Sequence, residues 1–170
     1  PIPTTAPEFE AAENEAKAKI EKLMNIKGSR SVDSFQKQLG HIMWEYVGMG
    51  RTKEGLTKAI PMIQALKEEF WKDVRITGDT QSMNPELEKA LRFSDHVELA
   101  ELIAKDALHR EESCGGHFRE EHQTEEGEAK RDDENFMYVA AWEYKDNGEH
   151  ELHKEELNYE FIKVQQRNYK

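Results

Sequence analysis

The feature that most constrains the fold is one long amphipathic segment, which runs from Asn84 to about Glu112. Its first residues, Asn-Pro-Glu, are a strong helix-start signal, because Asn84 can cap a helix and Pro85 suits the first helical position. Apolar and small side chains then recur every three or four residues, which predicts a single helix about 40 Å long. These residues are Leu87, Ala90, Leu91, Ser94, Val97, Ala100, Ala104, Ala107 and Leu108. A helix with one apolar stripe needs partners to cover it, so we expect a helical bundle.

Three shorter segments with the same period precede this one. The pattern predicts a helix over about 8–27, a second that starts with a capping box at 33–36, and a third that Thr52 caps. Pro61 lies inside the third segment, where it should kink or delay the helix because proline lacks a backbone donor. The aromatic side chains that we expect in the core are Trp44, Phe70 and Trp71.

The pattern changes after the glycine pair at 115–116. Residues 119–135 are nearly all polar or charged, which indicates a loop. Residues 136–144 are rich in aromatic side chains and predict a strand, and the Asp-Asn-Gly sequence at 146–148 is a hairpin turn signal. Apolar and polar residues alternate over 157–161, within the segment that should return as the second strand.

These patterns predict a mainly α fold. We expect an antiparallel three- to four-helix bundle, similar to a spectrin repeat, with a β-hairpin appended at its C-terminal side. The expected organisation is a linker or cut end at 1–7, the bundle at 8–114, a polar loop at 115–135, and the hairpin and tail at 136–170.

Charge and cysteine content exclude several classes of partner. The chain carries 35 acidic and 24 basic residues, a net charge of −11. It therefore lacks the clustered Lys and Arg that nucleic acid and anionic membranes require. No apolar run approaches the ~20 residues that span a bilayer. Cys114 is the single cysteine, so an intramolecular disulfide is impossible and a reducing compartment is favoured.

The residues around the glycine pair offer two kinds of chemistry. Cys114, His117 and His122, with His109 upstream, have ligand types that suit zinc, although a site with one cysteine and no Cys-x-x-Cys is a weak signal. Cys114 beside a histidine could also be a thiol nucleophile, but a lone cysteine is more often inert. The Gly-Met-Gly sequence at 48–50 lacks a third glycine and follows a helical pattern, so it does not predict a dinucleotide loop.

Two short motifs lie in and beside the polar loop. From 110 to 121 the chain reads Arg-Glu-Glu-Ser-Cys-Gly-Gly-His-Phe-Arg-Glu-Glu, and from 131 to 136 it reads Arg-Asp-Asp-Glu-Asn-Phe. Together they resemble the pattern R-x-E-S-x-G-x-H-x-R-x-D/E followed by R-D-D-x-N-F/W, from the C-terminal region of the flavoprotein subunit of succinate dehydrogenase and fumarate reductase. Most of the chain beyond the first helix resembles this region more weakly. The family usually has Arg at the position of Cys114 and Ala or another small residue at Gly116, and the insert 120–130 is long.

The resemblance implies a function for the parent protein. Such flavoproteins carry FAD, interconvert succinate and fumarate, and pass electrons to an iron–sulfur subunit, which is linked to a membrane anchor subunit. Their FAD-binding and capping domains precede the region that this chain resembles. No position here matches a catalytic, cofactor-binding or metal-binding residue of the family, so none is assigned. The implied role is a C-terminal helical domain, inactive alone, that supports the FAD domain and subunit contacts in a complex at the cytoplasmic, inner face of the membrane.

The resemblance also implies a contact with the flavin domain. The residues expected at that contact are Arg110, Glu112, Ser113, His117, Arg119, Arg131, Asp132 and Asp133. We further expect 115–135 to be ordered mainly by the other domains, because its arginines and acids would lack partners in this chain. Two other hypotheses stay open: a free-standing acidic helical adaptor that binds partner helices, and a small metal-dependent enzyme built on Cys114 and the histidines.

Overall fold

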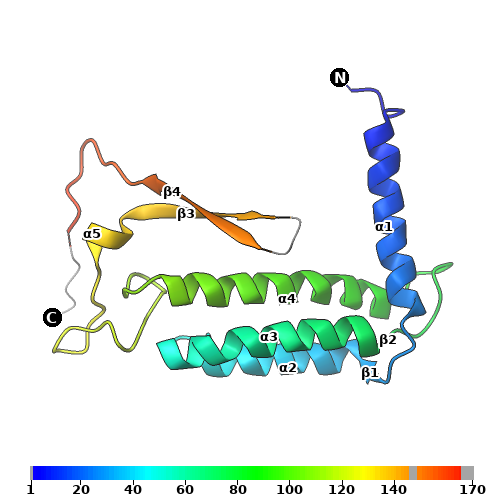
Figure 1. Ribbon diagram of the computed structural model, residues 1–170, viewed down its shortest axis with the longest axis horizontal. Coiled ribbons are helices and arrows are strands. Elements are labelled where there is room, and N and C mark those ends of the chain that lie inside the picture. The colour runs from blue at the N-terminus through cyan, green and yellow to red at the C-terminus, as the bar shows by residue number, and fades with distance from the viewer. Residues whose placement is uncertain (1, 146–148, 166–170) are drawn as a thin grey trace.

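The computed structural model describes residues 2–145 and 149–165 and shows three long helices packed side by side (Figure 1). They are α2 (Val32–Tyr46), α3 (Lys53–Asp73) and α4 (Pro85–His109). The chain reverses direction between successive helices, so neighbours in sequence are antiparallel neighbours in space. The predicted fold class, a mainly α bundle with a C-terminal hairpin, is confirmed.

Aromatic side chains fill the centre of this bundle. Phe35 of α2, Phe70 of α3 and Phe93 of α4 are fully buried. Their ring centroids are 5.4 Å apart for Phe35–Phe70, 5.9 Å for Phe35–Phe93 and 4.7 Å for Phe70–Phe93. These spacings suit edge-to-face and tilted aromatic pairs, which add to the stabilisation from area burial. The aliphatic core around them includes Leu23, Leu39, Ile42, Leu56, Ile63, Leu66 and Val97.

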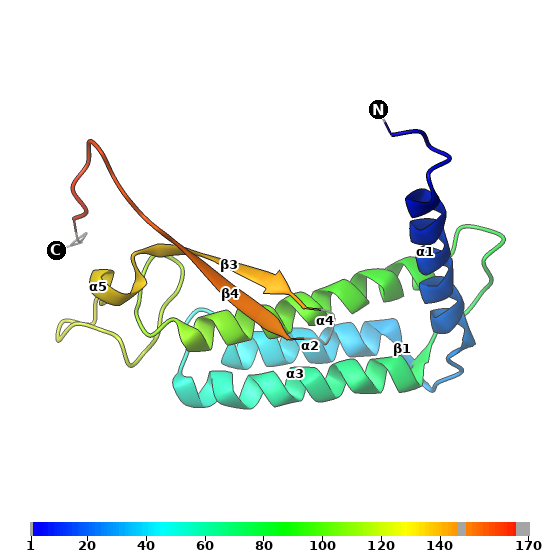
Figure 2. The ribbon, with the colours of Figure 1, turned by 45° about the horizontal axis from the view of Figure 1, so that its top comes forward.

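Helix α1 (Pro7–Asn25) contacts the bundle only at its C-terminal end. Leu23 is its one buried residue, and the N-terminal half projects away from the other helices (Figures 1 and 2). Ala12 and Ala16 belong to the helical pattern that predicts this segment, but both side chains are exposed. The reason is that alanine buries little area, so these positions give α1 little free energy for lying along the bundle. The bundle is therefore at the three-helix end of the predicted range.

Side-chain caps determine where the long helices start. Thr52 Oγ1 accepts the Gly55 N–H at 3.0 Å, and Asn84 Oδ1 accepts two N–H groups of the first turn of α4 at 3.1 Å each. Both predicted caps are confirmed. The predicted cap of α2 is wrong, because α2 begins at Val32 and Ser31 Oγ accepts the Ser34 N–H at 3.3 Å.

Proline and tryptophan behave differently from expectation. Pro61 lies inside α3, which already begins at Lys53, so the proline does not delay the helix. Trp44 is 82% exposed, so its placement in the core was wrong. The reason is geometric: Trp44 lies two residues beyond the buried Ile42, about 200° further around the helix at ~100° per residue.

Phe70 is buried as expected, whereas Trp71 is only partly buried.

A short parallel pair joins the α1–α2 connection to the end of α3. Strand β1 (Arg30–Ser31) pairs with β2 (Val74–Arg75). Gly28 approaches the end of α3 so closely that a Cβ atom would lie 1.9 Å from Asp73 O. Only glycine fits at this crossing of the two backbones.

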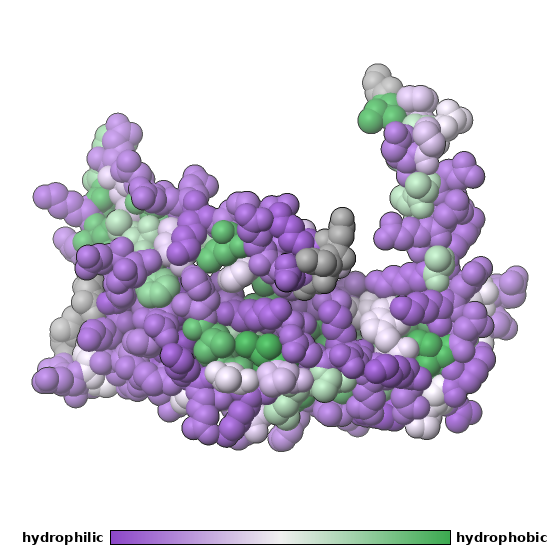
Figure 3. Space-filling model, viewed as in Figure 1, coloured by the Kyte–Doolittle hydropathy of each residue, from purple (hydrophilic) through white to green (hydrophobic). Residues whose placement is uncertain are grey.

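The C-terminal hairpin lies over α4. Strand β3 (Tyr138–Tyr144) pairs antiparallel with β4 (His150–Glu156), with Tyr138 opposite Glu156. The Trp142 indole N–H donates to Asp106 Oδ1 of α4 at 2.8 Å. The alternation over 157–161 was misleading, because β4 ends at Glu156; the predicted turn at 146–148 lies outside the described residues. On the face shown in Figure 3 most side chains are hydrophilic, and an apolar area lies below the hairpin.

Candidate functional site

The polar loop closes the C-terminal end of α4 through one buried arginine. Arg119 is 1% exposed. Its Nη1 donates to the carbonyl oxygens of Ala107 and Leu108 at 3.0 and 3.3 Å, and its Nε donates to Glu121 Oε2 at 3.2 Å. The last carbonyls of a helix lack partners within it and carry a partial negative charge. Arg119 supplies both the missing donors and the positive charge.

Two further buried polar residues fix the loop around Arg119. Ser113 Oγ accepts the Arg119 N–H at 2.8 Å and is 3.1 Å from the Arg119 carbonyl oxygen, to which it donates. Glu112 accepts from Arg110 Nε through one oxygen and from the Asp132 N–H through the other, each at 2.8 Å. Ser113 and Glu112 are 0% and 2% exposed. Glu112 thereby joins the two motifs of the loop through a bond between residues that are twenty positions apart.

A second set of bonds joins the loop to the connection between α2 and α3, at the end of the bundle opposite α1 (Figures 1 and 2). The Arg51 N–H donates to Phe118 O at 3.0 Å, and the Glu120 N–H donates to Arg51 O at 2.9 Å. Arg51 Nη1 lies 2.8 Å from His117 Nδ1. The Lys53 N–H, at the start of α3, donates to a Glu121 carboxylate oxygen at 2.5 Å. We call this set of bonds the turn–loop junction.

Burial and neighbouring arginines set the protonation of His117. Burial lowers the pKa of His117 below its usual range; the hydrogen bond to the Arg110 carbonyl opposes this, and the positive charges of Arg51, Arg119 and Arg110 lower it further. Because the folded-state pKa is depressed, the stabilisation that neutral His117 provides is complete above the ordinary histidine pKa of about 6.5 and is lost as the pH falls through the folded value.

The structure brings the eight predicted contact residues into one connected region. Arg110, Glu112, Ser113, His117 and Arg119 are linked directly by the bonds above, and the Asp132 N–H connects the second motif to Glu112. Asp132 also accepts the Asn135 N–H at 3.2 Å and so caps the short helix α5 (Asp133–Phe136). Arg131 Nε donates to Asp133 Oδ1 at 2.9 Å.

Our expectation that these groups lack partners within the chain was therefore wrong. Polar side chains, together with backbone bonds such as Ser113 N–H to Lys130 O at 2.9 Å, hold the loop where apolar packing cannot. Sequence reasoning also missed Arg51 and Glu121 as members of this network. No local signal marked Arg51, which lies in the short turn between Gly50 and the helix cap Thr52.

Amide exchange provides a direct check of this internal order. In the isolated chain near neutral pH, the amides of Ser113 and Arg119 should exchange slowly, because both are buried and bonded. The amide of Gly116 should exchange fast, because that residue is exposed. Hydrogen–deuterium exchange followed by NMR measures all three. Equal, fast exchange at all three amides would show that other domains are needed to order the loop.

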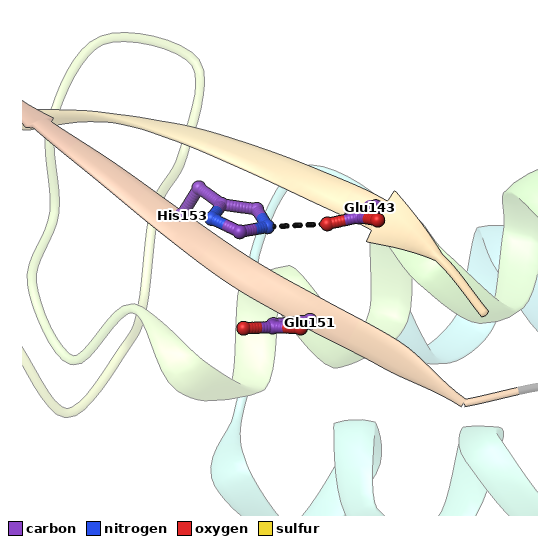
Figure 4. A group of neighbouring side chains, drawn as sticks. All are labelled: Glu143, Glu151 and His153. Atoms are coloured by element: carbon purple, nitrogen blue, oxygen red, sulfur yellow. Dashed lines mark hydrogen bonds and ion pairs between the residues drawn. The ribbon is translucent and has the colours of Figure 1, made fainter.

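The hypothesised zinc cluster is not assembled. Both ring nitrogens of His117 are engaged, Nδ1 with Arg51 and Nε2 with the Arg110 carbonyl oxygen at 2.8 Å. Among the described residues, the one group of three potential ligand side chains within mutual reach is elsewhere, on the outer face of the hairpin. It comprises Glu143, Glu151 and His153 (Figure 4).

This hairpin group is an ion-pair network on the surface. Lys145 Nζ lies 2.9 Å from Glu143 and 2.7 Å from Glu151, and His153 Nε2 lies 2.6 Å from Glu143. The hydrogen bond from Lys145 is the main cause that lowers the pKa of Glu143. The lysine already neutralises charge that would otherwise attract a cation.

Across the part of the chain that the structure describes, no helix combines the length and the apolar character needed to cross a membrane.

Comparison with known proteins gives a consistent result. Residues 36–169 match the family described as fumarate reductase flavoprotein C-term. The fumarate reductase flavoprotein subunit of Proteus vulgaris is 33% identical over 135 residues, which cover 79% of this chain and 22% of that protein. The succinate dehydrogenase flavoprotein subunit of Bacillus subtilis is 30% identical over 111 residues, 65% of this chain and 19% of that protein. The chain thus spans about a fifth of the length of these relatives.

Solved structures show the same likeness in three dimensions. A chain of a quinol-fumarate reductase with menaquinol molecules matches with a TM-score of 0.80 and 27% identity. The match covers 94% of this chain and 27% of that one. An adenylylsulfate reductase from Archaeoglobus fulgidus matches with a TM-score of 0.72 at 18% identity, which shows a shared fold.

Proposed function

Because the chain belongs to the family of fumarate reductase flavoprotein C-terminal domains, we propose that it acts as the helical support domain of an FAD-dependent enzyme that interconverts succinate and fumarate. The observation that carries this proposal is how the family-signature residues are used. Glu112, Ser113 and Arg119 are buried and bonded to helix ends and loop backbone. Side chains so engaged brace a structure and are not free to act on a substrate.

The described residues do not fit an FAD site of their own. A dinucleotide loop follows a strand and opens a helix within a parallel sheet. Here the Gly-Met-Gly sequence at 48–50 follows α2, and the parallel strand pair among the described residues, β1 with β2, has strands of two residues each. We propose that FAD is held by other domains of the parent protein.

The eight signature residues divide into two proposed roles at the domain contact. Glu112, Ser113 and Arg119 form the buried brace that gives the loop its shape. The more accessible Arg131, Asp132 and Asp133, with the partly exposed Arg110, present charge toward the FAD-binding and capping domains, and the partly exposed His117 adds a neutral polar ring. An arginine beside a carboxylate suits such a contact, because its planar fork gives directional hydrogen bonds.

Further partners follow from the same proposal. The parent protein would pass electrons to an iron–sulfur subunit and would be linked through it to a membrane anchor subunit. The complex would lie at the cytoplasmic, inner face of the membrane. Nucleic acid is a poor partner, given the net charge of −11.

A domain replacement tests the proposal. This chain should replace the corresponding region of the Proteus vulgaris flavoprotein subunit and preserve succinate-dependent dye reduction, whereas the isolated chain should be colourless and inactive. The measurements are the visible flavin spectrum and the turnover of each protein. Stoichiometric flavin on the isolated chain, or turnover by it, would contradict the support role. An inactive hybrid that nevertheless folds and binds FAD would contradict it as well.

A second candidate, the acidic helical adaptor, has one observation in its favour. The N-terminal half of α1 and the side chain of Trp44 are exposed, as a partner-binding surface would be. Tryptophan is enriched at the centres of protein interfaces. The domain replacement separates the two, because an adaptor would not restore turnover to a flavoprotein.

A further inference from the structure

The turn–loop junction depends on a histidine in one tautomer. His117 Nε2 lies 2.8 Å from the carbonyl oxygen of Arg110, so this nitrogen carries the hydrogen and donates it. His117 Nδ1 lies 2.8 Å from Nη1 of Arg51. A guanidinium can only donate, so Nδ1 must accept and therefore carries no hydrogen. The observed contacts define the neutral imidazole.

Protonation of this ring would change an attraction into a repulsion. The second proton would sit on Nδ1 and point at a donor of Arg51, which cannot accept it. The hydrogen bond would be lost, and two positive charges would face each other within hydrogen-bonding distance. The bonds from Arg51 N–H to Phe118 O and from Glu120 N–H to Arg51 O lie in the same junction.

The charged groups around His117 reinforce this arrangement. Arg51 comes from the α2–α3 connection, Arg110 follows α4, and Arg119 comes from the loop itself. Two acidic groups of the loop are committed to other partners: Glu112 accepts from Arg110, and Glu121 accepts from Arg119 and Lys53. Burial lowers the pKa of Arg51; the charge of Asp106 of α4 opposes this, and the positive charge of Arg119 lowers it further.

We propose that His117 makes the turn–loop junction a pH-sensitive lock, which holds the polar loop to the α2–α3 connection while the imidazole is neutral and releases it when the imidazole gains a second proton. The bonds of Arg119 to the end of α4 do not involve His117, so this end of the loop stays attached. Release therefore changes the shape of the loop without unfolding the bundle. The device belongs to this chain's own geometry and does not rest on the proposed enzyme function.

Hydrogen exchange of the 170-residue chain at several pH values, corrected for intrinsic rates, tests the lock. The amides of Arg51 and Glu120 should be protected near pH 7.5 and lose protection as His117 titrates, by about tenfold for each pKa unit separating the locked and free histidine. The amide of Leu66, in the middle of α3, should keep its protection over the same range. NMR of the imidazole nitrogens gives the titration midpoint of His117 in the same samples.

Two variants complete the test. His117→Gln keeps a donor and an acceptor but cannot gain a proton, so protection of Arg51 and Glu120 should become independent of pH. His41→Gln, at an exposed histidine of α2, should leave the pH dependence unchanged. If H117Q fails to fold, the wild-type data decide, because the loss of protection and the titration of His117 must share one midpoint. Constant protection through that midpoint, or the same loss in folded H117Q, would overturn the proposal.

Discussion

Replacing Phe70 with alanine is expected to lower the free energy of unfolding by about 3–5 kcal/mol. The Phe70 ring is fully buried and contacts the rings of Phe35 and Phe93, with centroids 5.4 and 4.7 Å away. These rings come from three different helices, so the cavity would lie where all three meet and could not close without moving a helix. Urea unfolding followed by circular dichroism measures the change.

The matched control is Phe9→Ala, which removes the same side chain from α1, where it is 52% exposed. Its cost should stay within about 0.5 kcal/mol, because about half of this side chain already faces solvent. Similar losses in the two variants would contradict the position of the core at the junction of α2, α3 and α4.

The second large effect is expected for Arg119→Met, with a loss of about 2–4 kcal/mol. Methionine has a similar length but no donor, so the buried carbonyl of Ala107 and its neighbour at Leu108 lose their hydrogen bonds. Each buried group left without a partner costs ~1–3 kcal/mol. Thermal or urea unfolding of the variant gives the value, and exchange at the last turn of α4 should increase.

Arg92→Met provides the control for this substitution. Arg92 also pairs with an acid, Glu88, but both side chains are largely exposed. An exposed ion pair contributes ~0–1 kcal/mol, so this variant should be nearly as stable as the wild type. If Arg119→Met were equally mild, water or a rearranged loop would be satisfying the end of α4, and the brace role would fail.

The long helices could be predicted because their signals are local. Asn84 and Thr52 cap helices through atoms only two or three residues away, and the stripe that contains Phe35, Leu39 and Ile42 repeats within a single helix. Each such signal is contained in a short window of sequence. The fold class followed from them.

Two of the errors share one physical cause, because both depended on contacts that a short window does not contain. The face of α1 that carries Ala12 and Ala16 can pack only if another element lies beside the N-terminal half of the helix. Residues 157–161 alternate like a strand, but β3 is already fully paired with His150–Glu156. Trp44 was misplaced for a different reason, because its residue type was weighed above its angle around α2.

The residues of the candidate site were proposed through the family resemblance, but the hydrogen bonds between them were not predicted. The sequence motif includes Arg119, but it does not indicate that this side chain donates to the α4 carbonyls. The partner Arg51 lies 66 residues before His117, a separation that no local pattern reveals. Long-range hydrogen bonds between polar side chains leave no periodic trace in a sequence.

That same separation has a consequence for the order of events during synthesis. The α2–α3 connection leaves the ribosome well before the segment that binds it. At translation rates of ~5–20 residues per second, the 66 residues between Arg51 and His117 take about 3–13 s to appear. During that interval the partners that Arg51 has for its side chain are the nearby carbonyl oxygens of Val47 and Gly48, which accept from Nε at 3.1 and 3.2 Å in the folded chain. A nascent chain halted before residue 117 should therefore contain a formed α2–α3 pair whose connecting turn is still open to solvent and to chaperones.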